Sequence, residues 1–171
     1  DAVDHIANRL DRAWVQRNMT AWFNHAFGLE RLVIADGAGR IVYEAENGRS
    51  APPGRLAAYW VAAGPLVADI RRREAARAPL ARPDGVHHIA PPIQASGFVA
   101  VDGQPQLLSA TLVQPDYGTV MPTAAGRAPI VLGVKTFDAT AVARIAHDLA
   151  LSDARLDGPV RHDWLTNSVA V

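Results

Sequence analysis

The sequence contains no cysteine and a single lysine, and aromatic residues make up only 6% of its 171 positions. Without cysteine, disulfides, thiolate metal ligands and a cysteine nucleophile are all excluded. No apolar run approaches the roughly 20 residues that a membrane-spanning helix needs. The amino end also lacks the charged and then apolar pattern of a signal peptide. These absences remove several functional classes but do not settle the compartment.

Charge is balanced, with 17 basic and 17 acidic residues. The chain therefore has no overall field that would attract nucleic acid or an anionic membrane. We expect no nucleic-acid partner. All the basic residues except Lys135 are arginine, and this bias together with heavy alanine usage reflects composition rather than phosphate binding.

Length and composition predict one domain, because 171 residues with 49% hydrophobic content suffice for one good core. We divide it into amino-terminal helices over 1–28, a core over 29–150 and a carboxyl-terminal extension over 151–171. The chain begins inside a helical pattern, at Asp1-Ala2-Val3-Asp4, and ends in the strand-like Ser168-Val169-Ala170-Val171. We therefore expect a piece of a longer protein, truncated at its carboxyl end.

The order of the strand signals is the most informative pattern in the chain. Two apolar runs flank Asp36-Gly37-Ala38-Gly39, which predicts a hairpin, and a further turn is expected at Asp102-Gly103. The sequence predicts an α+β fold with a PAS-like or Cache-like five-stranded antiparallel sheet, and its strands are expected at 31–36, 40–46, 95–102, 105–114 and 129–137.

Helical periodicity is expected in four places. A first amphipathic helix carries the stripe Val3, Ile6, Leu10, Ala13 and Trp14, and a second runs from Asn18 or Thr20 to Gly28 with the stripe Trp22, Phe23, Ala26 and Phe27. A crossover helix over 55–77 packs on one face of the sheet, and Gly64-Pro65 should kink or split it. Its charged end, Arg71 to Glu74, is expected to be solvated. Asp138 should cap a last helix over 141–149.

Candidate chemistry is sparse. His87-His88 lacks a third metal ligand nearby, and the pairs His147-Asp148 and His162-Asp163 lack a nucleophile setting. Gly37 and Gly39 precede a strand rather than a helix, which favours a hairpin turn over a phosphate loop. We therefore expect no catalytic residue, no metal and no cofactor.

Several short motifs, in order along almost the whole chain, resemble the fourth class of CHASE extracellular sensor domains. They are Asp4-His5-Ile6, Asp11-Arg12-Ala13-Trp14, Asn18-Met19-Thr20, Gly28-Leu29-Glu30, Asp36, the segment Gly39 to Tyr43, the segment Gly97 to Gly103, Pro115-Asp116-Tyr117-Gly118, and Ala128-Pro129-Ile130-Val131. The resemblance implies a periplasmic domain between two membrane-spanning helices, which this sequence does not include. It also implies an output domain such as a cyclic di-GMP synthase or hydrolase (GGDEF, EAL) or a histidine kinase.

Three functions follow in order of preference. The first is a ligand-sensing extracytoplasmic module that shifts between two conformations. The second is a ligand-free dimerisation module of a membrane receptor or histidine kinase, and the third is a small hydrolase that rests on His162-Asp163 alone. Because the amino-terminal stripe is more apolar than a small sheet edge can cover, we also predict a homodimer.

An unknown small molecule is the expected partner, bound between the central strands and the covering helix. The candidate ligand-binding residues are Tyr43, Trp60, Phe98, Ser109, Thr111, Tyr117 and Lys135. Lys135 is either a charge on an exposed sheet face or a ligand contact. If it faces the pocket, the ligand should be an anion such as a carboxylate.

Overall fold

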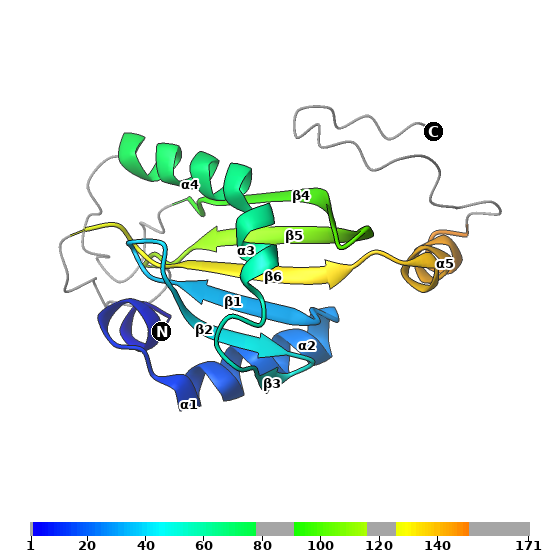
Figure 1. Cartoon of the computed structure of the whole chain (residues 1–171), viewed down its shortest axis with the longest axis horizontal. Helices are drawn as coiled ribbons and strands as arrows, with labels where there is room; N and C mark the ends of the chain where they lie inside the picture. Colours follow the sequence, from blue (N-terminus) through cyan, green and yellow to red (C-terminus); the bar gives the residue numbers. More distant parts are fainter. Residues whose placement is uncertain (1, 78–90, 116–125, 151–171) are drawn as a thin grey trace.

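The computed structural model describes residues 2–77, 91–115 and 126–150 (Figure 1). The chain begins with the π-helical turns and helices η1 (Val3–Asn8), α1 (Arg12–Val15), η2 (Gln16–Thr20) and α2 (Ala21–Phe27). The other elements are β1 (Arg31–Ala35), β2 (Ile41–Glu46), β3 (Arg49–Ser50), α3 (Ala57–Ala62), α4 (Gly64–Ala76), β4 (Gln94–Val101), β5 (Gln104–Leu112), β6 (Ile130–Thr136) and α5 (Ala139–Asp148). The fold class is α+β, as predicted.

One antiparallel sheet organises the described residues, with strand order β3-β2-β1-β6-β5-β4. All five predicted strands are present, and their bounds lie within two residues of the expected ones. The predicted number of strands is wrong, however, because Arg49–Ser50 adds a sixth strand at the edge beside β2.

The sixth strand follows from a tight turn at Asn47-Gly48. Both residues have positive φ, 50° and 75°, and Glu46 pairs with Arg49 across the turn. Asparagine and glycine tolerate this conformation, which matches the twist of the two strands that it joins. Asp102-Gly103 forms the corresponding turn between β4 and β5, as predicted.

The amino-terminal helices differ from the prediction in where they break. The chain leaves the helix at Arg9, and a second helical stretch then runs without interruption from Arg12 to Phe27. It starts there because the Asp11 carboxylate caps it, accepting a hydrogen bond from the Trp14 backbone nitrogen at 2.9 Å. Gly28 ends α2 in the left-handed conformation, as expected.

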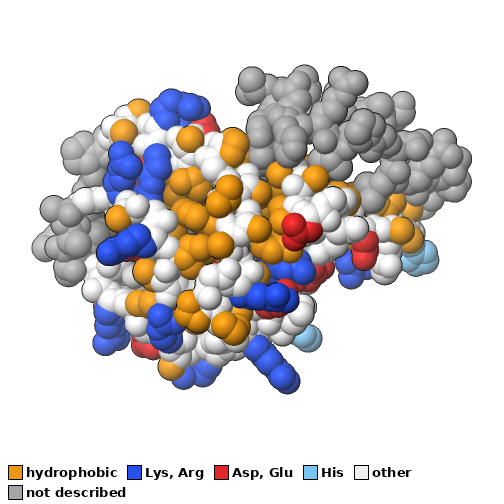
Figure 2. Space-filling model, in the orientation of Figure 1, with side chains coloured by type: hydrophobic (Ala, Val, Ile, Leu, Met, Phe, Trp, Pro, Cys, Tyr) orange, Lys and Arg blue, Asp and Glu red, His pale blue; other side chains and the backbone are white. Residues whose placement is uncertain are grey.

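Helices α3 and α4 cover one face of the sheet and bury the main core against it (Figure 1). Leu56, Leu66 and Ile70 pack on side chains such as Val33 and Leu132. The predicted split occurs between α3 and α4, where Pro65 occupies the first turn of α4. Figure 2 shows further hydrophobic side chains gathered at the centre of this face.

The solvated end predicted for α4 is wrong for Arg71 and Glu74, which are held against the sheet, but is confirmed for Arg72, whose side chain is 74% exposed. The Arg71 guanidinium and the Glu74 carboxylate form an ion pair at 2.8 Å, with only 12% and 8% of their side chains exposed. Both also bond to the backbone of Ala128, which precedes β6. The pair therefore docks α4 onto the sheet.

The amino-terminal helices cover the opposite face over β2, β1 and part of β6. Their buried side chains, Val3, Ile6, Val15 and Met19, pack with Leu32, Ile34, Tyr43 and Val131. The stripe that suggested a dimer is therefore mostly internal, since Val3 and Ile6 are buried, Leu10 and Trp14 are partly buried, and only Ala13 is exposed. On this face, the β4 side chains Gln94, Ser96 and Phe98 remain exposed.

Candidate ligand-binding cavity

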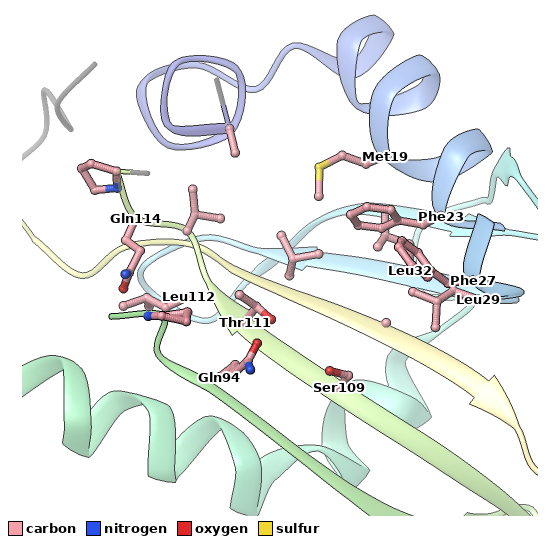
Figure 3. A pocket seen from close by; sticks show the side chains of 16 residues that line it. Met19, Phe23, Phe27, Leu29, Leu32, Gln94, Ser109, Thr111, Leu112 and Gln114 are labelled. Atoms are coloured by element: carbon pink, nitrogen blue, oxygen red, sulfur yellow. The ribbon is translucent and has the colours of Figure 1, made fainter. Parts of the chain in front are cut away.

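A cavity of about 720 Å³ lies where the amino-terminal helices stop covering the sheet (Figure 3). One wall comes from η2 and α2, and the other from β1, β4, β5 and β6. Small-molecule sites in proteins typically measure roughly 300–1,000 Å³. The cavity is therefore large enough for an organic ligand.

The helical wall is apolar. Met19, Phe23 and Phe27 follow one another at four-residue spacing, so their side chains project from the same side of the helix. Figure 3 shows all three on the helix side of the cavity, together with Leu29. Trp22 supports this wall, because its ring centroid lies 5.3 Å from that of Phe23 and 5.1 Å from that of Phe27.

The sheet wall combines hydroxyl groups with small and aliphatic residues. Ser109 on β5 pairs with Gly133 on β6, and Gly133 pairs with Leu32 on β1, so all three share one level of the sheet. Thr111 and Val131 form the next pair on the same face. This register places lining residues from three neighbouring strands side by side on the sheet wall of the cavity.

Gly133 lets Leu29 approach the sheet closely. A Cβ atom added at Gly133 would lie 2.9 Å from the Leu29 Cδ1 atom, closer than real Cβ atoms come to a neighbour. A glycine at this position therefore leaves space for Leu29 at the cavity floor.

The polar groups of the cavity are on the sheet side. The Ser96 hydroxyl donates a hydrogen bond of 3.0 Å to the Ser109 hydroxyl. Gln94 lies opposite Thr111 in the β4–β5 register, and the Gln114 amide donates to the Pro91 carbonyl at 2.9 Å. Within the described part of the chain, the Thr111 hydroxyl has no hydrogen-bond partner. It is thus available to a bound molecule.

None of the 16 residues that line the cavity carries a charge or an imidazole. The described residues also include no group of three or more His, Cys, Asp or Glu side chains placed to hold a metal ion. What the cavity offers is an aromatic and aliphatic wall facing neutral hydrogen-bonding groups.

Two of the predicted site residues, Ser109 and Thr111, line this cavity. Tyr43 is instead 2% exposed, and its hydroxyl bonds to Gln16 at 2.9 Å and contacts Thr20 at 3.1 Å. Trp60, on α3, packs against the core on the opposite face of the sheet. The structure therefore does not bring Tyr43 and Trp60 to the cavity.

Two further candidates, Phe98 and Lys135, lie on the cavity face but outside its lining, and Tyr117 lies outside the described residues. Phe98 is 50% exposed and packs edge to face on Phe137, with centroids 5.0 Å apart. The Lys135 ammonium donates a hydrogen bond of 3.2 Å to the Phe27 carbonyl at the end of α2. Lys135 thus joins β6 to the helix that forms the apolar wall.

Sequence reasoning missed the helical wall and Gln94. The signal for Phe23 and Phe27 was present in the apolar stripe of the second helix, but neither residue was predicted to contact a ligand. Gln94 had no signal, because only the strand register places it beside Thr111.

The model of one protein family, the CHASE4 domain, matches residues 1–157. The chain belongs to the CHASE4 domain family. CHASE4 domains are extracellular sensory domains of signalling proteins, so the predicted family and the sensory role are confirmed. A search of curated proteins found no match. Across residues 2–77, 91–115 and 126–150, no helix is both long and apolar enough to cross a membrane.

Proposed function

We propose that this CHASE4 domain senses a small ligand in the periplasm and reports its presence to the rest of a transmembrane signalling protein. The observation that carries the proposal is the cavity of about 720 Å³ between α2 and the sheet. A sensory family supplies the role, and the cavity supplies a place for a ligand to act.

The walls of the cavity suggest how binding would be transmitted. A ligand there touches α2 on one side and β5 and β6 on the other, so it changes the free energy of one arrangement of helix and sheet relative to another. The hydrogen bond from Lys135 to the Phe27 carbonyl joins these two walls outside the cavity lining. We propose that the amino-terminal helix, α1 to α2, carries the resulting shift.

We further assign the sheet to the PAS and Cache type. Five strands in the order β2-β1-β6-β5-β4, with the crossover helices α3 and α4 on one face, support this assignment, and β3 is an addition at the edge. For the output we propose control of a cyclic di-GMP synthase or hydrolase, as the sequence resemblance implies.

A homodimer remains part of the proposal, on a different surface from the one first considered. Trp22 and Phe27 on α2 are 51% and 56% exposed and in ring contact, whereas the amino-terminal stripe is mostly internal. Pairing of these aromatic surfaces would place two copies of the transmitting helix side by side. Sedimentation velocity on the wild type and on Trp22→Ser tests this, and identical monomers at high micromolar concentration would contradict it.

A filled cavity provides the test of the sensing role. In the intact signalling protein, Ser109→Leu should occupy the cavity and change the basal level of cyclic di-GMP in cells. Ser96→Leu is the matched control, because it breaks the same hydrogen bond between the two serines but lies outside the cavity lining. Equal cyclic di-GMP levels in both variants and the wild type, with normal protein abundance, would refute the proposal.

A further inference from the structure

We infer that the ligand of this cavity is a neutral, mainly apolar molecule, with a ring or branched hydrocarbon against α2 and a hydrogen-bonding group directed at Thr111 and Ser109. The inference rests on the proposed sensing function and specifies the chemistry of its ligand. It excludes the anionic ligand that a pocket-facing Lys135 would have implied.

The exclusion of charged ligands follows from what surrounds the cavity. Among the described residues, no side chain that lines the cavity is charged, and the Lys135 ammonium on this face of the sheet donates to the Phe27 carbonyl instead. Arg31 and Arg71 pack with the α3 and α4 side, where they bind acidic partners. An ion would lose its hydration in the cavity without gaining a countercharge, which is unfavourable.

The helical wall selects for apolar shape. Met19, Phe23 and Phe27 offer a flexible thioether and two rings, of which Phe23 also packs on Trp22. Apolar surface that a ligand buries here contributes about 25 cal/mol per Å². Aromatic ligands would gain further from stacking or edge contacts with the two phenylalanines.

The polar groups of the sheet wall fix the orientation of the ligand. The Thr111 hydroxyl can donate or accept a hydrogen bond and has no partner among the described residues, and Ser109 accepts only one hydrogen bond, from Ser96. Gln94 lies exposed across from Thr111 and provides an amide at the same level. A neutral ligand that carries a hydroxyl, amide or aromatic amine group can therefore bind here in one orientation.

Two fluorescent probes with one shared skeleton test this chemistry on the folded domain. N-phenyl-naphthylamine is neutral and carries one N–H group, whereas anilinonaphthalene sulfonate adds a negative charge to the same rings. We expect the neutral probe to bind in a one-to-one ratio and at least roughly tenfold more tightly than the sulfonate. Equal affinities, or tighter binding of the sulfonate, would overturn the inference.

Variants then locate the probe. Ser109→Leu and Phe23→Ala should weaken binding of the neutral probe, whereas the controls Ser96→Leu and Phe98→Ala, which alter the same sheet face outside the cavity, should not. Thr111→Val removes only the hydroxyl at nearly constant shape, and it should weaken the probe by roughly fivefold to tenfold. A helical signal in circular dichroism equal to that of wild type confirms that each variant folds.

The outcomes separate this inference from the sensing proposal. Probe binding that Ser109→Leu leaves intact overturns the assignment of the ligand to this cavity, whatever the cyclic di-GMP levels show. If probe binding is lost when the chain dimerises, a second copy covers the cavity, and this also overturns the assignment of the ligand to the cavity. If the neutral probe binds as expected while Ser109→Leu leaves cyclic di-GMP unchanged, the ligand chemistry stands and the sensing function fails.

Discussion

Lys135 on β6 and Phe27 on α2 are joined by a hydrogen bond of 3.2 Å from the lysine Nζ atom to the phenylalanine carbonyl. The carbonyls of the last helical turn lack partners within the helix, so a cation at this end is favourable. Residues 108 positions apart in the chain are thereby connected at the rim of the cavity. The bond holds the apolar wall to the sheet.

Removing this cation should affect stability and not ligand binding. Lys135→Met keeps the length of the side chain, and we expect it to lower the free energy of unfolding by roughly 0.3–1 kcal/mol. The affinity for N-phenyl-naphthylamine should stay within about twofold, since Lys135 is not part of the cavity lining. Chemical denaturation and fluorescence titration measure the two quantities, with the exposed Arg144→Met on α5 as control. A large loss of affinity would restore Lys135 as a ligand contact.

Tyr43 should behave as a structural residue. Its buried hydroxyl donates to Gln16 at 2.9 Å, so Tyr43→Phe should cost roughly 0.5–1.5 kcal/mol of unfolding free energy. Probe affinity should not change, because the cavity does not include Tyr43. Tyr59→Phe is the matched control, since the Tyr59 hydroxyl makes no hydrogen bond among the described residues. Loss of probe binding without loss of stability would show instead that Tyr43 reaches the ligand.

The sheet could be predicted because its signals are local. Alternating or continuous apolar runs and the turn Asp102-Gly103 specify strands through residues that are neighbours in sequence. The short β3 carried an equally local signal, Asn47-Gly48, so it was predictable and was overlooked. The break at Arg9–Asp11 was harder, because an apolar stripe continues through it and only the cap at Asp11 ends the pattern.

The site could be predicted only in part, because its walls come from helices and strands that are far apart in the sequence. Ser109 and Thr111 follow from the expectation that a central strand faces the pocket, but strand alternation does not say which face is open. Trp60, on α3, belongs to the core on the opposite face of the sheet. Tyr43 lies on the same face as the cavity, but the amino-terminal helices cover it. Burial of Arg71 and Glu74 depends on Ala128, more than 50 residues away, and no local pattern indicates it.

Glu44 provides a stringent test of how the crossover is anchored. Its carboxylate is 4% exposed and accepts hydrogen bonds from the backbone nitrogens of Gly54 at 2.5 Å and Leu56 at 2.7 Å. Glu44→Gln replaces one acceptor oxygen by an NH₂ group that cannot accept, so we expect a loss of roughly 1.5–3 kcal/mol in urea denaturation. Glu46→Gln, on the same strand and 24% exposed, should cost at most about 1 kcal/mol. Similar losses in both variants would argue against this anchoring role.

Asp36 makes the hairpin between β1 and β2 sensitive to pH. Its carboxylate accepts hydrogen bonds from the backbone nitrogens of Ala38 at 3.0 Å and Arg40 at 2.9 Å, and from the Arg40 guanidinium at 2.8 Å. Burial alone would raise the pKa of Asp36, but these bonds, led by the Arg40 backbone nitrogen, outweigh it and hold the pKa below the ordinary value of 3.8. A carboxyl with a depressed folded pKa stabilises the fold in its ionised form.

The lowered pKa of Asp36 in the folded state predicts how the stability of the Asp36→Asn variant depends on pH. The amide oxygen still accepts the backbone bonds but the charge is gone, so the variant should be less stable than wild type at neutral pH. The pKa of Asp36 is higher in the unfolded chain than in the folded one. The difference in unfolding free energy between wild type and Asp36→Asn should therefore be fully present above pH 3.8 and shrink as the pH falls below that value. It should vanish once the pH has passed through the lower, folded pKa. Urea denaturation of both proteins across this acidic range measures it. Asp102→Asn, in the β4–β5 turn and without a hydrogen bond to its carboxylate among the described residues, is the control for loss of a carboxylate from a hairpin turn. A difference for Asp36→Asn that is constant with pH would mean that the carboxylate charge contributes nothing to the hairpin.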